Sequence, residues 1–267
     1  MTILDKIIKK TSVAVDELKK RTSINQLESI AKLQPPARSL VDAIRGCSHV
    51  PIIAEIKKAS PSRGNILPGA NIVDIARQYQ NGGAVAISVL TDYAFFKGCI
   101  DDLKTVRQSV DILILRKDFI IDPIQIIEAR AAGADAVLLI AAALDAQKLK
   151  SLYETSLHFG MIPLIEIHHI DELETVMSLE PQLIGINNRN LKTMTVDIQT
   201  SATLRADIPE TICVVGESGI SSVDHIHFLR KAGINAFLIG TSLMLSDHPE
   251  THLKTLNLME KNEKDAY

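Results

Sequence analysis

The sequence predicts an α/β protein: a closed (βα)₈ barrel with an N-terminal helical extension. The main observation is that short apolar runs alternate with amphipathic helical patterns from residue 51 onward. Alternation of this kind produces a parallel sheet with right-handed crossovers. The composition agrees, because 46% of the residues are hydrophobic, only 4% are aromatic and Trp is absent. Such an aliphatic core suits parallel strands that are buried on both faces.

Eight strands, each followed by a helix, are expected. The strands are predicted from their apolar runs at residues 51–56, 84–90, 111–115, 136–140, 161–165, 183–187, 211–215 and 236–239. Asp, Ser or Asn near a helix start and Pro in its first turn are helix-opening signals. They place the helix starts near Ile72, Asp101, Pro123, Asp145, Asp171, Asp197, Ser221 and Pro249.

Repeated joints favour a closed barrel over an open sheet. Gly83, Gly133 and Gly233 each end a predicted helix and are followed almost at once by a strand. Gly133 and Gly233 lie four predicted units apart. The repeat is therefore about 25 residues long, which fits a TIM barrel made of similar halves. An open Rossmann sheet would favour a dinucleotide-binding fingerprint after the first strand, and the sequence has none there.

Residues 1–48 lie outside this alternation. Their apolar side chains recur at helical spacing at Leu4, Ile7, Ile8, Val15 and Leu18. A second short helix is expected at residues 37–45, after Pro35 and Pro36. We therefore expect one structural domain with two parts: a helical extension of residues 1–48, packed on one end of the barrel, and a catalytic barrel of residues 49–267.

Composition and charge exclude several classes of protein. A net charge of −3 and a pI near 6.2 argue against a nucleic-acid partner. The longest apolar run, residues 136–144, is about half of a membrane span, and charges interrupt the N-terminus where a signal peptide would be apolar. We expect a cytoplasmic protein without membrane contact, monomeric or, as the alternative, a weak homodimer. Cys47, Cys99 and Cys213 are widely spaced and are expected to be reduced core residues.

Polar side chains end five of the predicted strands on one parity. Residues two apart in a strand share a face, so Ile53 leads to Glu55 and Lys57. The same alternation leads to Lys117, Glu166, Asn187 with Arg189, and Glu217. Active sites of this fold lie at the C-terminal ends of the strands. We expect one cavity there, in which cations and burial shift the pKa values of carboxyl groups and allow acid–base chemistry.

Glycine-rich turns follow the last two strands. Residues 216–222 (GESGISS) come after the seventh strand, and Gly240 and Thr241 come after the eighth. Glycine lets backbone N–H groups approach an anion, and these two loops frequently hold phosphate in this fold. A small phosphorylated substrate is therefore expected.

No metal site is expected. His168 and His169 would point to opposite faces of an extended segment, and no third ligand has telling spacing. We expect these two residues, with His225 and His227, to be surface or loop histidines. Asp101 and Asp102 lie at a helix start, where capping accounts for them.

Residues 52–64 (IIAEIKKASPSRG) resemble the signature of the indole-3-glycerol phosphate synthase family. Further matching segments are 115–119 (LRKDF), 164–167 (LIEI), 185–191 (GINNRNL), 216–220 (GESGI) and 237–244 (FLIGTSLM). The similarity covers essentially the whole chain, and the extension resembles the family's extra helices over the barrel mouth. It implies that 1-(2-carboxyphenylamino)-1-deoxyribulose 5-phosphate is closed to indole-3-glycerol phosphate, with loss of carbon dioxide and water. The reaction belongs to tryptophan biosynthesis and needs no cofactor.

The resemblance implies a role for each matching position. Lys117 would be the general acid, and Glu166 and Glu55 would handle protons in ring closure and dehydration, in an order that the sequence leaves open. Lys57 would hold the anionic substrate, with proton donation as a second role in the family. The remaining positions would bind or orient: Asn187 and Ser218 as positioning residues, Arg189 supporting the carboxylates, Ser60 near the substrate carboxylate, and Gly219, Gly240 and Thr241 with Lys57 in the phosphate grip.

Three points stay open in this comparison. Phe96, with Tyr93 and Phe95 as alternatives, would line the anthranilate pocket. Glu217 receives no role. Asn188 and Thr241 stand where other small polar residues are common in the family, and the chain is expected to lack the second, isomerase barrel of some bifunctional relatives.

Other functions fit parts of the pattern. An aldolase-like enzyme would use Lys117 or Lys57 as a Schiff-base nucleophile. Phosphoribosylanthranilate isomerase is also a phosphate-binding barrel, but it would need a different ending of the first strand than Glu55 and Lys57. Loss of a charged mouth residue would favour a non-catalytic barrel, and all of them are present.

Overall fold

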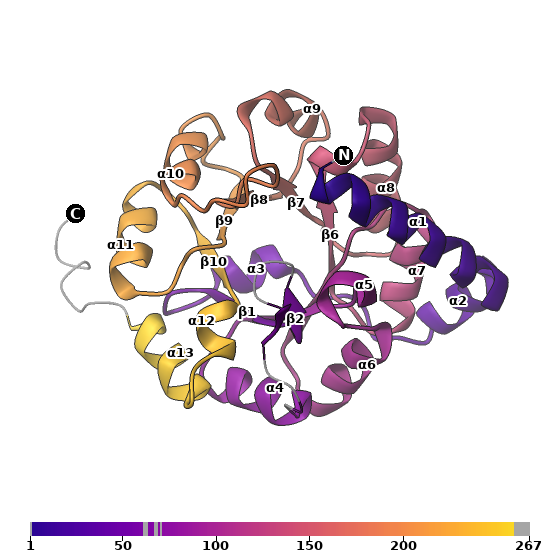
Figure 1. Ribbon diagram of the computed structural model, residues 1–267, viewed down its shortest axis with the longest axis horizontal. Helices are drawn as coiled ribbons and strands as arrows, with labels where there is room; N and C mark the ends of the chain where they lie inside the picture. Colours follow the sequence, from indigo (N-terminus) through magenta and orange to yellow (C-terminus); the bar gives the residue numbers. More distant parts are fainter. Residues whose placement is uncertain (1, 61–63, 67–68, 70, 259–267) are drawn as a thin grey trace.

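The structure is a computed structural model that describes residues 2–60, 64–66, 69 and 71–258. Eight parallel strands close into a barrel in the order β1-β10-β9-β8-β7-β6-β5-β4, and helices form a ring around it (Figure 1). The barrel strands are β1 Ile52–Ile56, β4 Ala86–Leu90, β5 Leu113–Lys117, β6 Ala136–Ile140, β7 Leu164–Ile167, β8 Leu183–Asn187, β9 Cys213–Glu217 and β10 Ala236–Ile239. The predicted (βα)₈ barrel is confirmed. Pro61, Ser62 and Arg63 of the signature segment lie outside the described residues.

Three strands run further toward their carboxyl ends than predicted. The third, fifth and seventh predictions stop just before a charged residue, whereas Lys117, Glu166 and Glu217 stay within β5, β7 and β9. Their charges can remain in the ladder because they pair with one another inside the barrel. β7 also begins later than predicted, after Pro163, which has no N–H to give to a ladder.

A helix follows each barrel strand on the outside. These helices are α4 Ile72–Asn81, α6 Ile100–Ser109, α7 Pro123–Ala131, α8 Ala146–His158, α9 Leu173–Met177, α10 Gln199–Arg205, α11 Val223–Lys231 and α13 Pro249–Asn257. Shorter elements occupy the loops: the hairpin of β2 Ala59–Ser60 and β3 Gly64–Asn65, α5 Tyr93–Phe96, η1 Ala141–Ala143, η2 Ile170–Glu172 and α12 Thr241–Met244. The predicted capping holds at α6, where the Asp102 carboxylate accepts from the Cys99 N–H.

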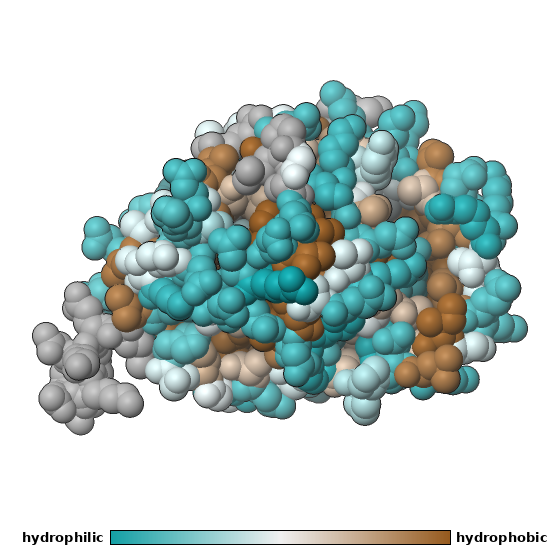
Figure 2. Space-filling model, turned by 90° about the horizontal axis from the view of Figure 1, so that it is seen from below, coloured by the Kyte–Doolittle hydropathy of each residue, from teal (hydrophilic) through white to brown (hydrophobic). Residues whose placement is uncertain are grey.

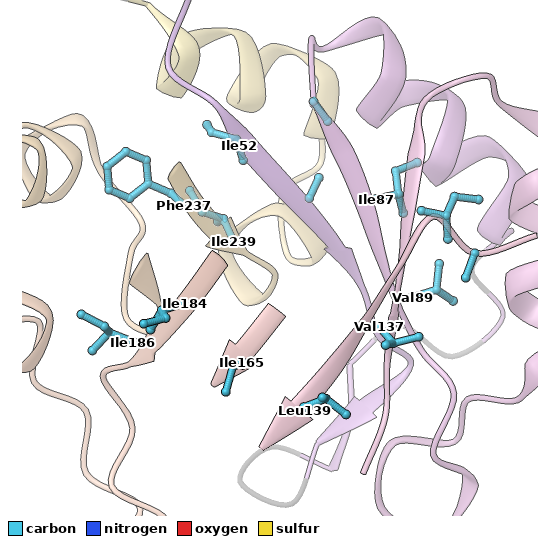
Figure 3. Packing of buried hydrophobic residues seen from close by; sticks show 14 of the residues in the cluster. Ile52, Ile87, Val89, Val137, Leu139, Ile165, Ile184, Ile186, Phe237 and Ile239 are labelled. Carbon is cyan, nitrogen blue, oxygen red and sulfur yellow. The ribbon is translucent and has the colours of Figure 1, made fainter. Parts of the chain in front are cut away.

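Two apolar layers build the core. Outward-facing strand residues such as Ile52, Ile87 and Phe237 pack between the strands and the helices (Figure 3). Inward-facing residues such as Ile53 and Leu115 form a second layer inside the barrel. The two layers follow directly from the strand alternation, because successive side chains point to opposite faces.

The N-terminal extension forms three helices, α1 Ile3–Arg21, α2 Ile24–Ala31 and α3 Leu40–Arg45. The prediction missed α2 and began α3 too early, because Ser39 caps α3 through the Asp42 N–H. The expectation that the extension packs on one end of the barrel is wrong. Leu40 of α3 packs in the inner layer at the N-terminal end of the strands, α2 packs on α7, and the first turn of α1 reaches the opposite end.

A buried carboxylate ties the extension to the barrel. Asp135 accepts hydrogen bonds from Arg38 Nη2 at 3.1 Å, from Arg107 Nη1 at 2.9 Å and from the Ile114 N–H at 2.9 Å. Its side chain is only 5% exposed. The three partners come from the extension, from α6 and from β5, so this one side chain joins three parts of the fold.

We expect Asp135→Ala to lower the free energy of unfolding by about 3 kcal/mol, because it leaves the buried N–H of Ile114 without this acceptor and removes the carboxylate that Arg38 and Arg107 share. Urea denaturation measures the loss. Asp111→Ala is the matched control, since Asp111 lies 3.6 Å from the same Arg38 but is fully exposed. It should change the free energy by less than about 0.5 kcal/mol. Equal effects of the two substitutions would contradict the structural role of Asp135.

The face in Figure 2 is mainly hydrophilic, with its hydrophobic residues in separate groups. Among the described residues, no helix is both long and apolar enough to cross a bilayer. One expectation about the cysteines is wrong: Cys213 is buried, but Cys99 is exposed and Cys47 is half-buried. Cys99 occupies the N-cap of α6, which lies at the surface, so it does not contribute to the core.

Candidate active site

A cavity of about 470 Å³ opens at the C-terminal ends of the barrel strands. It is lined by every residue that the sequence predicts for the site: Glu55, Lys57, Ser60, Phe96, Lys117, Glu166, Asn187, Arg189, Ser218, Gly219, Gly240 and Thr241. Ile3, Leu4 and Ile7 of α1 also line it. The inward parity of the strand ends therefore brings these residues together, and the first turn of α1 adds an apolar edge.

Lys117 lies at the centre of the polar floor. Its Nζ is 2.8 Å from Glu166 Oε2 and also donates to Glu217 Oε2. Burial alone would lower the pKa of Lys117, but three neighbouring carboxylates, led by Glu166, outweigh burial and raise that pKa. The ammonium group is therefore charged at neutral pH and is held in place from two sides.

Glu166 is fixed through both of its oxygens. Lys117 binds Oε2, while Asn187 Nδ2 donates to Oε1 at 3.1 Å and His168 Nε2 lies 3.2 Å from the same oxygen. Burial favours the neutral acid, yet the charge of Lys117 and the contact with His168 prevail, and the pKa of Glu166 falls well below its usual value. Glu166 is thus an ionised carboxylate with a defined orientation.

Glu217 is the main residue for which the sequence suggested no role. Its carboxyl is only 2% exposed, and Oε1 has no hydrogen-bond partner among the described residues. Burial, assisted by the negative charge of Glu166, raises the pKa of Glu217 to about 8 even though Lys117 opposes the shift. Two carboxyl groups around one lysine therefore have opposite protonation preferences, an arrangement that suits proton transfer. The inward parity of Glu217 on β9 was the only signal in the sequence that it belongs to the site.

The raised pKa of Glu217 predicts a pH-dependent stability. Between the ordinary glutamate pKa of about 4.3 and pH 8, the unfolded chain releases this proton while the folded protein keeps it. Glu217 therefore costs stability increasingly as the pH rises through this window. We expect Glu217→Gln to be stabilised relative to wild type, with a difference that grows from pH 5 to pH 8 in urea denaturation. A difference that is constant across this range would contradict the raised pKa.

A second ion pair lies at the carboxyl end of β1. Lys57 Nζ donates to Glu55 Oε1 at 2.6 Å, and both side chains are largely buried. Gly240 provides the space for this pair, because a Cβ there would lie 2.3 Å from Glu55 Oε1 and 3.0 Å from Lys57 Nζ. Gly240 was predicted as a phosphate contact. In the structure it also makes room for the carboxylate of the neighbouring strand.

The turns after β9 and β10 form the other end of the cavity. Ser218 and Gly219 both have positive φ values, of 65° and 78°. A Cβ on Gly219 would come within 2.5 Å of Val196, so only glycine fits this position. Thr241 lines the same end, where Ser242 Oγ is buried without a partner among the described residues. This end offers hydroxyl groups and a backbone that can approach an anion closely.

An apolar wall lies near Phe96. Its ring centroid is 6.2 Å from that of Phe119, and both rings line the cavity. Tyr93, one of the alternatives, is 71% exposed. The sequence suggested no role for Phe119, although it is the last residue of the matching segment LRKDF. On the same rim Ser60 lies in β2, and Arg189 donates to the Met194 carbonyl at 3.1 Å.

The expectation of a surface or loop position is wrong for His168 and right for His169. His168 is only 4% exposed and lies beside Glu166, whereas His169 is exposed. β7 continues through Ile167, so His168 stays inside the barrel wall, where Glu166 and Glu172 compensate for burial of the ring. No group of His, Cys, Asp and Glu suited to a metal ion occurs in the described part of the chain.

The fold and the cavity define a class: a (βα)₈-barrel protein whose strand ends enclose paired ammonium and carboxyl groups beside a glycine-lined turn. Residues 4–256 match the family model described as indole-3-glycerol phosphate synthase. The chain belongs to the indole-3-glycerol phosphate synthase family, enzymes of tryptophan biosynthesis.

Individual relatives agree with this assignment. The chain is similar to the indole-3-glycerol phosphate synthase of Rhodopirellula baltica, with 44% identity covering 91% of this chain and 94% of the relative. The corresponding protein of Dechloromonas aromatica is 43% identical, over 95% of this chain and 98% of its own length. Among solved structures, thiamine phosphate pyrophosphorylase from Pyrococcus furiosus superposes with a TM-score of 0.60 at 17% identity, covering 82% of this chain and 96% of its own. At that identity the likeness concerns the fold alone.

Proposed function

We propose that this protein closes 1-(2-carboxyphenylamino)-1-deoxyribulose 5-phosphate to indole-3-glycerol phosphate and is a carboxy-lyase. A carbon of the anthranilate ring attacks the ribulose carbonyl carbon while a proton is delivered to the carbonyl oxygen. Loss of carbon dioxide restores the aromatic ring, and loss of water completes the indole. The observation that carries the proposal is the ammonium of Lys117, held between Glu166 and Glu217 in a cavity lined by family-matching residues.

Lys117 is the general acid in this proposal. Its ammonium is oriented from two sides, so it can donate to an oxygen on which negative charge develops. Glu166 and Glu55 accept and return protons during ring closure and dehydration. Glu217, which prefers its protonated form at neutral pH, can return a proton to the Lys117–Glu166 pair between these steps.

The remaining cavity residues bind and orient the substrate. Lys57, Gly219, Gly240 and Thr241 receive the phosphate, and Ser60 and Arg189 face the carboxylate end. Phe96 packs on the anthranilate ring, and Asn187 and Ser218 orient the reacting groups. Holding both ends of one molecule brings the ring carbon and the carbonyl together, which supplies a large part of the rate enhancement. No step in this scheme uses a cofactor.

The Schiff-base alternative is less well supported. A lysine nucleophile needs a lowered pKa so that its amine is neutral, whereas the carboxylates around Lys117 raise its pKa. Borohydride reduction in the presence of substrate separates the two mechanisms. The acid–base mechanism leaves the protein mass unchanged, and a covalent adduct at Lys117 or Lys57 would contradict it.

The proposed reaction is tested directly by its product. The protein, mixed with the carboxyphenylamino-deoxyribulose phosphate, is expected to produce indole fluorescence, and mass spectrometry identifies indole-3-glycerol phosphate. Absence of product at high enzyme concentration would contradict the proposal. For the whole protein we further propose a cytoplasmic monomer, in which residues 1–48 form the extension and residues 49–267 the catalytic barrel.

A further inference from the structure

His168 lies behind the active site, on the side of Glu166 that faces away from Lys117. Its Nε2 is 3.2 Å from Glu166 Oε1, and its Nδ1 is 3.9 Å from Glu172 Oε2. The Glu172 carboxylate also accepts the backbone N–H of His168 at 2.8 Å. The imidazole therefore lies between two carboxylates, one from β7 and one from η2, and its side chain is 3% exposed.

The ring does not line the cavity, so any effect on the reaction must pass through Glu166. It shares the Oε1 atom of Glu166 with Asn187, while Lys117 binds the other oxygen. Neither ring nitrogen has a well-aligned hydrogen bond within the described residues, so the ring acts on Glu166 through a close contact and through charge. Neighbouring anions favour the protonated form of a buried histidine.

The charges around the ring agree with this. Burial alone would lower the pKa of His168, but the contact with Glu166 and the charges of Glu166 and Glu172 raise it, and Glu217 adds to this effect where it is ionised. Lys117 is the cation on the other oxygen of Glu166. Burial raises the pKa of Glu172, and the His168 N–H opposes that shift.

We propose that His168 is a positioning residue for Glu166, which, as an imidazolium held between Glu166 and Glu172, orients the Glu166 carboxylate and keeps it ionised. The inference rests on the proposed function, since it assigns the control of one of its proton-transfer groups. His168 touches no reacting atom in this scheme. Its contribution is to the orientation and charge of a group that does.

The test compares His168→Leu with His168→Gln. Leucine removes both charge and polarity, so we expect kcat to fall about tenfold with little change in KM, as for a misplaced catalytic group. The acidic limb of the kcat–pH profile should move up by about one pH unit, because Glu166 loses a neighbouring cation. Glutamine can place its amide nitrogen near the position of Nε2 and donate to Oε1, but it carries no charge. It should recover most of kcat and leave the acidic limb displaced.

His169→Leu is the matched control, since His169 is the exposed neighbour, and it should keep the wild-type kcat and pH profile. Wild-type kcat and an unshifted acidic limb in His168→Leu would overturn the proposal. If the leucine variant fails to fold, as thermal melting would show, the glutamine variant decides, and an unshifted acidic limb there is the contradicting result.

A measurement without substrate separates this inference from the proposed reaction. NMR titration of the imidazole should give His168 a pKa above the ordinary value of about 6.5, which falls in Glu166→Gln. If wild type made no product, the proposed reaction would fail, while this titration would still decide whether His168 and Glu166 are coupled. A His168 pKa below about 6.5 that does not change in Glu166→Gln would overturn the coupling.

Discussion

Lys117→Ala is expected to lower kcat at least about a hundredfold, the usual effect of removing a general acid. The structure supports this size of effect, because no other ammonium contacts Glu166 or Glu217 among the described residues. KM should change much less, since phosphate and carboxylate binding rest on other residues. Stopped assays of indole fluorescence at saturating substrate measure the loss.

Removal of Lys117 also leaves two buried carboxyl groups without their cation, so stability must be measured beside activity. Lys117→Met keeps most of the side-chain volume and should lose activity as the alanine variant does. Lys58→Ala is the control: Lys58 follows Lys57 after β1, but it pairs with Asp102 and does not line the cavity. Its turnover should stay near that of wild type. Unchanged turnover in the folded Lys117 variants would remove Lys117 from the proposed role.

Gly240→Ala should lower kcat/KM about a hundredfold, the effect that a misplacement of about 1 Å can have on a reacting group. The added methyl group would lie 2.3 Å from Glu55 Oε1, so the Glu55–Lys57 pair must move. Gly240 has a negative φ of −122°, outside the left-handed region that favours glycine, so the close contact with Glu55 is the reason for the loss. A crystal structure of the variant would show the displaced pair.

Gly160→Ala provides the opposite case. Gly160 has a φ of +74° and no atoms within 4 Å of the added methyl group. That substitution should cost about 1 kcal/mol of stability through strain and leave kcat/KM unchanged. If Gly240→Ala kept full activity, the close packing of Gly240 against Glu55 would not be needed for function.

Much of the cavity could be predicted from the strand pattern. Glu55 in β1 and Lys57 just after it are two residues apart, and the same parity places Lys117, Glu166 and Asn187 on the inside of their strands. The prediction succeeded because side-chain alternation is a local property of extended backbone. The path of the extension was not predictable in this way, because α2 and α3 are positioned by contacts with α7 and with the inner layer of the barrel.

Glu217 and His168 show the same limit. Glu217 shares the inward parity, but its raised pKa depends on burial beside Glu166. His168 follows Glu166 by two residues in the sequence, and a single histidine there is as compatible with a loop as with the barrel wall. Its burial depends on how far β7 extends and on Glu172, which η2 brings to the ring.

The sequence by itself determined the alternation of strands and helices, the inward face of each strand and the family, because each of these is written in short segments. Only the tertiary structure decided which charges meet: Lys117 and Glu217 are 100 residues apart in the chain and bind each other directly. Coulombic attraction and desolvation depend on distance and burial, and both are set by closure of the barrel. For that reason the residue types at the site could be read in advance, whereas their pKa values and the partnership of Glu166 with His168 could not.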